Sequence, residues 1–113
     1  MVKLRSRESE KTVILDISGK LMGGSDADEF RDIIHKLIEG GKKKIIVNLS
    51  GVRWVNSTGI GILITGYTTL RRNKGDLKLL NVSNKIESIL YVTKLNLIFE
   101  CFDDEEKAVA SYR

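Results

Sequence analysis

The chain has 113 residues, of which 42% are hydrophobic and 30% charged, the size and composition of one ordinary globular domain and not of a disordered segment. No apolar run approaches the roughly 20 residues of a membrane span, and the N-terminal MVKLRSRESEK lacks the apolar core of a signal peptide, so we expect neither. The net charge of +4 comes from scattered basic residues with no aromatic residues in register, so direct nucleic-acid binding is not expected either.

Two strands are expected at the start of the chain. Residues 2–7 alternate weakly between polar and apolar, and residues 12–18 (TVILDIS) follow a polar turn. The apolar residues of the second strand that share one face are Val13, Leu15 and Ile17. The pair predicts an antiparallel hairpin with one face buried.

A glycine-rich connection, residues 19–24, is expected to lead into the first helix. Ser25 with Asp28 three residues later resembles a capping box, with Asp in place of the usual Glu. Gly40 and Gly41 would end the helix. Its apolar stripe, at helical spacing, consists of Ala27, Phe30, Ile33, Ile34, Leu37 and Ile38.

The next strand, Lys44–Leu49, reads as buried on both faces, and residues 50–55 read as a short polar connection. A second helix is predicted over Thr58–Asn73. Its glycines are unusual, because each costs up to ~1 kcal/mol relative to alanine in a helix. Close packing on the sheet, or close approach of a partner near Gly59 and Gly61, would explain them. The residues expected to face inward are Ile60, Leu63, Ile64, Tyr67 and Leu70.

The last third of the chain predicts a strand, a helix, a strand and a short helix. The strands are Leu77–Val82 and Leu97–Phe102, and the helix between them is capped by Ser83. Asp103 with Glu106 resembles a second capping box before the C-terminal helix. The order β-β-α-β-α-β-α-β-α predicts a single α/β domain with about four helices. Its sheet is mixed and mostly parallel, with an antiparallel N-terminal edge strand.

Enzymatic chemistry is not expected from this sequence. Gly61 and Gly66 fit only the first part of a phosphate-binding loop, because Tyr67-Thr68 stands where Lys-Ser/Thr is required. Ser57 has no base beside it, since the only histidine, His35, belongs to another helix. The single Cys101 has no companions for a metal site or an internal disulfide, and we expect a free buried thiol in a cytoplasmic protein without cofactor or metal.

The most informative stretch is Asn56-Ser57-Thr58, directly before Gly59-Ile60-Gly61 and the second helix. The start of a helix has N–H groups without partners and favours negative charge. The Ser57 hydroxyl is therefore either a simple N-cap or a site for a phosphate. The residues alone leave both interpretations open.

The block VNLSGVRWVNSTGIGILI, residues 47–64, resembles the STAS domain of bacterial anti-sigma factor antagonists. The resemblance continues through DLKLLNVSNKIESILYVTKLNLIFECFDDEEKAV, residues 76–109, and covers nearly the whole chain. We therefore expect residues 1–113 to form a single STAS domain.

The resemblance implies a regulatory protein that binds an anti-sigma factor and thereby releases a sigma factor. In the family the anti-sigma factor is often a serine kinase with a GHKL-type fold, which phosphorylates the antagonist and switches it off, and a serine phosphatase reverses this. The matching residue is Ser57, with Thr58 as the alternative acceptor. The residues expected at the partner surface are Asn56, Ser57, Thr58, Gly59, Ile60, Gly23 and Gly24.

The chain departs from the family pattern at four places, one of which is Met22-Gly23-Gly24 in place of a more polar loop. Asn48 and Asn56 stand where the family usually has Asp, which removes two charges from what we take to be one neighbourhood. Lys94 stands where glycine is frequent, so that helix end is expected to be strained or rebuilt. Two alternatives remain: a STAS scaffold subunit of a stressosome-like or lipid-trafficking complex, and, with less support, a small nucleotide-binding protein.

Overall fold

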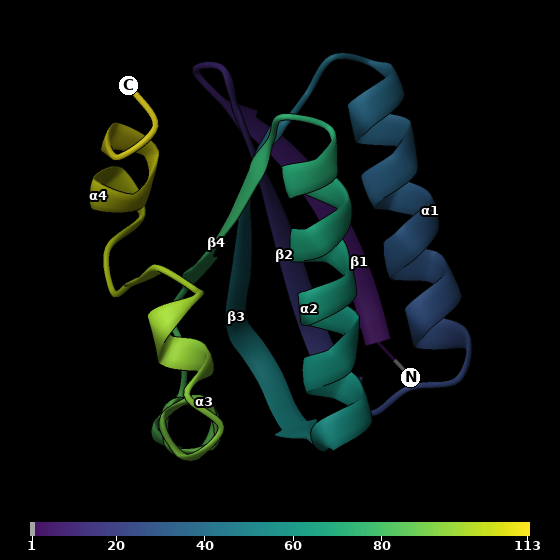
Figure 1. The fold of residues 1–113 in the computed structure, drawn as a ribbon, viewed down its shortest axis with the longest axis vertical. Coiled ribbons are helices and arrows are strands. Elements are labelled where there is room, and N and C mark those ends of the chain that lie inside the picture. The colour runs from purple at the N-terminus through teal and green to yellow at the C-terminus, as the bar shows by residue number, and fades with distance from the viewer. Residues whose placement is uncertain (1) are drawn as a thin grey trace.

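The fold is a five-stranded sheet with helices on both faces, as the computed structural model shows for residues 2–113 (Figure 1). The strands are β1 (Val2–Ser9), β2 (Thr12–Leu21), β3 (Lys44–Val55), β4 (Asp76–Leu80) and β5 (Cys101–Phe102). The helices are α1 (Ser25–Glu39), α2 (Ser57–Arg72), α3 (Asn84–Val92) and α4 (Glu105–Ala110), with a 3-10 turn at Leu95–Leu97. The strand order in the sheet is β1-β2-β3-β4-β5, with β1 antiparallel to β2 and all other pairs parallel. The predicted class and element order are confirmed.

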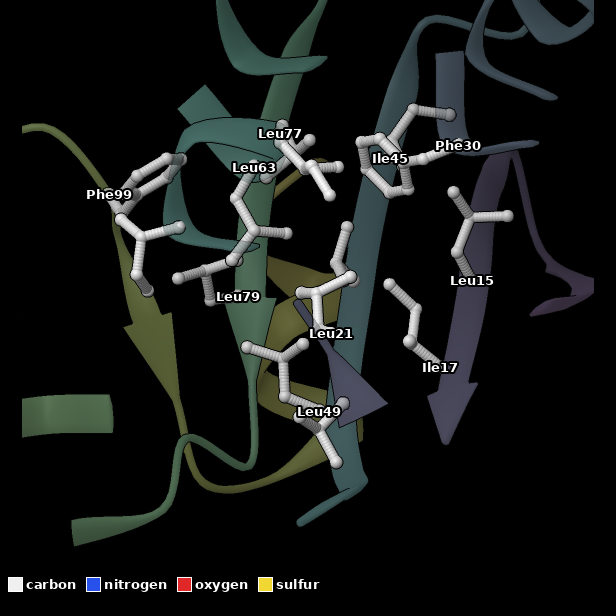
Figure 2. Packing of buried hydrophobic residues seen from close by; sticks show 14 of the residues in the cluster. Leu15, Ile17, Leu21, Phe30, Ile45, Leu49, Leu63, Leu77, Leu79 and Phe99 are labelled. Carbon is white, nitrogen blue, oxygen red and sulfur yellow. The ribbon is translucent and has the colours of Figure 1, made fainter. Parts of the chain in front are cut away.

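The two faces of the sheet are covered unequally. Helices α1 and α2 pack on one face over the main core, where the alternate residues of β2 (Val13, Leu15, Ile17) are fully buried, as predicted (Figure 2). On the other face α4 closes a smaller cluster that contains Ile14, Ile46, Leu80, Ala108 and Val109. Because α4 has only six residues, it covers only part of that face.

Strands β2 and β3 are longer than predicted and run side by side to Leu21 and Val55. The expected connection at residues 19–24 is therefore wrong over its first half, and the one at residues 50–55 is wrong over its whole length. Register shifts at two points let the strands continue through polar residues, and Gly51 lies so close to β2 that a Cβ there would be 2.7 Å from Ser18 Cβ. These extensions carry the chain directly to the start of α2.

Two of the three predicted helix caps are wrong. The N-cap of α1 is Gly24, whose φ of 68° a serine or aspartate adopts with difficulty, and Ser25 is already helical. Asp28, instead of completing a capping box, pairs with Arg31 at 3.0 Å. In α4 the cap is Asp104, which accepts a hydrogen bond from the Lys107 N–H, and not Asp103. Ser83 caps α3 as predicted, through the Ile86 N–H.

The predicted strand over Leu97–Phe102 is reduced to β5, two residues long. Lys94 takes the left-handed conformation, with φ 63°, so the end of α3 is rebuilt around a residue that adopts this backbone reluctantly. A 3-10 turn then occupies Leu95–Leu97, and the side chain of Leu97 points away from the core. Cys101 is free as predicted but exposed, because no element covers this edge of the sheet. Strand β4 also ends early, at Leu80, because Asn81 turns the chain with φ 57°.

Candidate partner-binding site at the start of helix α2

Asn56, and not Ser57, caps α2. Its side-chain oxygen accepts a hydrogen bond from the Gly59 N–H at 2.8 Å, and its amide nitrogen donates to the Met22 carbonyl at 3.3 Å. One side chain therefore fixes the helix start and also holds the loop that follows β2 against it. Asn and Ser rank equally as caps, so this choice is made by the geometry of the β3–α2 junction.

Ser57 is the first residue of α2 and is exposed. Within residues 2–113 its hydroxyl has no hydrogen-bond partner, so it is free to react. Thr58 is also exposed, and its methyl group lies so close to Gly23 that a Cβ on Gly23 would be 2.7 Å from it. The structure thus brings Asn56, Ser57, Thr58 and the loop containing Gly23 and Gly24 to one surface.

Gly59 and Ile60, also expected at the partner surface, are buried beneath it. A Cβ on Gly59 would overlap the carbonyl oxygen of Leu21, so this glycine lets α2 pack onto the end of β2. Gly66 has the same role against Phe30, where a Cβ would lie 2.5 Å from the ring. Close packing therefore explains two of the three unusual glycines of α2.

Gly61 is different, because a Cβ there would meet no atom within 4 Å. It lines a groove of about 420 Å³ between α1 and α2, together with Phe30 and the exposed His35 of α1. The groove ends at Thr58. Room for a partner's side chain therefore exists directly beside the candidate site. Because Gly61 and Gly66 both lie inside α2, they form no phosphate-binding loop.

The charge of this helix start is favourable for an added phosphate. The first turn of α2 contains no acidic residue, and no Asp or Glu occurs anywhere between Leu49 and Gly75. The N-terminal end of the helix dipole and the unpaired N–H groups therefore have no carboxylate of α2 itself beside them.

Asn48 does not belong to this neighbourhood, contrary to the prediction. It lies on the face that α4 covers, where its amide nitrogen donates to Asp16 at 2.8 Å and its side-chain oxygen accepts from the Asn81 amide at 3.1 Å. Asp16 in turn accepts from Arg7 at 2.7 Å. The two substitutions of Asp by Asn thus concern different parts of the molecule.

Arg7 joins the two ends of the chain, which the sequence analysis missed. Its guanidinium bonds both Asp16 and Glu105, the latter at 2.6 Å, and these hydrogen bonds lower the pKa of each carboxyl group. Arg7 and Glu105 are 98 residues apart, so no local pattern reveals the pair. The network fixes α4 to the sheet on the face opposite the core.

Replacing Asn56 with alanine tests the cap. We expect Asn56→Ala to lower the free energy of unfolding by about 1 kcal/mol, the usual value of an N-cap. Asn56→Asp should lower the free energy of unfolding by less, because it keeps the oxygen that accepts from the Gly59 N–H and loses only the amide that donates to the Met22 carbonyl. Urea denaturation of both variants measures the difference. Equal losses would show that the cap contributes nothing.

A family model for the STAS domain matches residues 3–108, and the chain therefore belongs to the STAS domain family. The anti-sigma-B factor antagonist of Staphylococcus aureus is 30% identical over 67 residues, which are 59% of this chain and 62% of that protein. The match thus spans less than two thirds of the relative's length.

Solved structures agree in fold over nearly the whole chain. A Thermotoga maritima protein described as an anti-sigma factor antagonist superposes with a TM-score of 0.86 at 22% identity, covering 96% of this chain and 92% of that one. The phosphorylated form of the Bacillus cell fate determinant SpoIIAA superposes with a TM-score of 0.76 at 22% identity, covering 98% and 100%. At these identities the likeness establishes the fold.

Residues 2–113 contain no group of three or more His, Cys, Asp or Glu side chains placed to hold a metal ion. None of the helices in this range has the length and apolar character needed to cross a bilayer.

Proposed function

We propose that this protein is an anti-sigma factor antagonist whose binding is switched off by phosphorylation of Ser57. The observation that carries the proposal is the Ser57 hydroxyl, exposed and without a hydrogen-bond partner at the first position of α2. The similarity to an anti-sigma-B factor antagonist supports the same assignment. The partner would be a cytoplasmic anti-sigma factor with a GHKL-type serine kinase fold, and a serine phosphatase would restore the active form.

The partner surface is formed by the exposed residues at the start of α2 and the loop beside them. Ser57, Thr58 and Gly24 are exposed there, Asn56 and Gly23 are half-buried, and the buried Gly59 and Ile60 support the surface from below. A phosphoserine carries about −1.5 to −2 charges, which the free helix N-terminus tolerates. A protein surface packed on the same spot would instead have to desolvate that charge. Phosphorylation would thus block binding and leave the fold intact.

The test compares Ser57→Asp with Ser57→Ala in binding to the captured partner. We expect Ser57→Asp to weaken binding by at least about tenfold, because a mismatched charge in an interface costs several kcal/mol. Ser57→Ala should bind like the wild type, and both variants should keep the wild-type melting temperature within a few degrees. Pull-down followed by mass spectrometry identifies the partner, and titration calorimetry measures its affinity.

Ser88→Asp is the matched control, since it adds the same charge to an exposed serine of α3. It should leave the affinity unchanged. Incubation of the wild type with the captured kinase and ATP, followed by phosphopeptide mapping, distinguishes Ser57 from Thr58. Undiminished binding by Ser57→Asp would overturn the switch, and capture of a complex without any kinase or anti-sigma factor would favour the scaffold alternative.

A further inference from the structure

The face of the sheet opposite α1 and α2 is only half covered. Helix α4 closes the part around Ile14 and Ile46, near one end of the sheet, whereas β3 runs on to the opposite end, where α2 begins (Figure 1). Beyond that cluster the alternate residues of β2 on this face are half-buried at Asp16 and Ser18 and exposed at Lys20. A bare stretch of sheet therefore remains next to, but distinct from, the start of α2.

This bare stretch is cationic. Lys3 and Lys20 lie on it as diagonal neighbours, since Lys3 pairs with Ser18 in the β1–β2 register and Lys20 follows two residues later. Lys20 in turn lies opposite Trp54 of β3, and the Lys85 ammonium group of α3 is 5.0 Å from the Trp54 ring centre. Within residues 2–113 none of the three lysines forms an ion pair.

Negative charge is missing from the ends of β2 and β3 that form this stretch. No Asp or Glu occurs between Ile17 and Gly24 or between Leu49 and Gly75. The carboxylates nearer the middle of the face, Asp16 and Glu105, are both bonded by Arg7. The three lysines, which form no ion pair among residues 2–113, therefore attract a partner of opposite charge from outside.

Trp54 gives the surface an anchor. Its side chain is 52% exposed although tryptophan is costly to leave in water, and it lies between Lys20 and Lys85. Tryptophan is enriched among the few residues that contribute most of the binding energy of protein interfaces. It is the only tryptophan of the chain, so its fluorescence reports on this surface alone.

We propose that Lys3, Lys20 and Trp54 of the bare sheet face, together with Lys85, which reaches Trp54 from α3, form a docking surface for an acidic segment of a partner protein. The carboxylates of the segment would pair with the three lysines, and its apolar side chains would cover Trp54. A single-stranded nucleic acid fits less well, because its bases would have to stack on Trp54, and Lys85 already covers one face of that ring. A lipid surface also fits less well, because Trp54 lies in a strand and not at a protruding tip. The inference goes beyond the proposed function and does not depend on Ser57.

The test uses a short fluorescein-labelled peptide of alternating glutamate and serine, with a glutamine-serine peptide of equal length as the uncharged probe. Anisotropy of the label and Trp54 fluorescence are both recorded during titration with the protein. We expect saturable binding of the acidic peptide only, weakening severalfold as ionic strength rises from about 0.01 M to about 0.15 M, over which the Debye length falls from roughly 30 to 8 Å. The double variant Lys20→Glu/Lys85→Glu should weaken binding by at least about tenfold.

Lys36→Glu is the matched control, because it reverses the charge of an exposed lysine on α1, on the other face of the sheet. It should change the affinity less than about twofold, and circular dichroism melts should show that all variants fold. Equal binding of both peptides, or equal weakening by Lys36→Glu, would overturn the proposal. Tighter binding of an oligothymidylate or of phosphatidylserine vesicles at matched charge would overturn it as well, in favour of a nucleic acid or a membrane. Ser57→Asp leaves the three lysines in place and should bind the acidic peptide like the wild type. The peptide titration therefore tests the docking surface independently of the proposed phosphorylation switch.

Discussion

Gly59→Ala is expected to lower the free energy of unfolding by about 3 kcal/mol, the largest effect of any single methyl group added to this chain. The added Cβ would overlap the Leu21 carbonyl oxygen, and neither partner can move, because one belongs to a helix turn and the other to the end of a strand. The whole start of α2 would have to shift, carrying Ser57 with it. At roughly 4 °C per kcal/mol for a domain of this size, the melting temperature should fall by about 12 °C.

Gly61→Ala, two residues after Gly59 in the same helix, is the control for this prediction. The position is open, with no atom within 4 Å of an added Cβ, so alanine brings only its better helix propensity. We expect a gain of up to ~1 kcal/mol. Differential scanning calorimetry of both variants measures the effects, and a destabilised Gly61→Ala or an unaffected Gly59→Ala would contradict the assigned packing.

The sequence predicted the elements of this fold well where hydrophobic periodicity is strong. The apolar stripe of α1 is buried or half-buried along one face of the helix, and the apolar run at the start of β3 is buried on both faces of the strand, as the two patterns predict. Helix starts were predicted less well. Gly24 and Asp104 replace Ser25 and Asp103 as caps, since the capping residue is chosen by the backbone angle at which the chain enters the helix.

The sequence also predicted the candidate site only in part, because its details depend on backbone geometry and on contacts with distant residues. The sequence placed Asn56, Ser57 and Thr58 at a helix start, but which of them caps the helix depends on the Met22 carbonyl, which a distant loop supplies. The burial of Gly59 likewise depends on Leu21, 38 positions earlier in the chain, so local patterns do not reveal it. Contacts between residues far apart in sequence are set by sheet register, and the unexpected extension of β2 and β3 determined them here.

Asn48→Asp should be the other strongly destabilising change, by about 1–2 kcal/mol at neutral pH. In the wild type the Asn48 amide donates to Asp16, and an aspartate at 48 would place a second carboxylate at that distance of 2.8 Å. The loss combines a charge-assisted hydrogen bond with like-charge repulsion. It is kept moderate because the Asp16 side chain is 29% exposed, so that water screens the pair.

The pH dependence of this loss follows from the two pKa shifts. In the wild type, hydrogen bonds from Arg7 and then Asn48 lower the pKa of Asp16, so its stabilisation is present above the ordinary carboxyl pKa and is lost as the pH falls below it. In Asn48→Asp the two adjacent carboxylates raise the pKa of one of them, and the folded state then takes up a proton more readily than the unfolded state. The deficit relative to the wild type should therefore be largest near neutral pH and shrink toward about pH 4.

Urea denaturation at neutral and acidic pH measures this difference. The double variant Asp16→Asn/Asn48→Asp is the control, since it leaves one carboxylate and one amide at the pair with their positions exchanged. It should recover part of the stability at neutral pH but not all of it. Arg7 would keep its hydrogen bonds to Glu105, but the carboxylate at position 48 lies on β3, one strand further from Arg7 than Asp16 does. A deficit of Asn48→Asp that is independent of pH would show that the lost hydrogen bond, and not charge repulsion, dominates. Because Asn48 lies on the face opposite α2, none of these changes should alter phosphorylation of Ser57, which separates the stabilising role of this asparagine from the proposed switch.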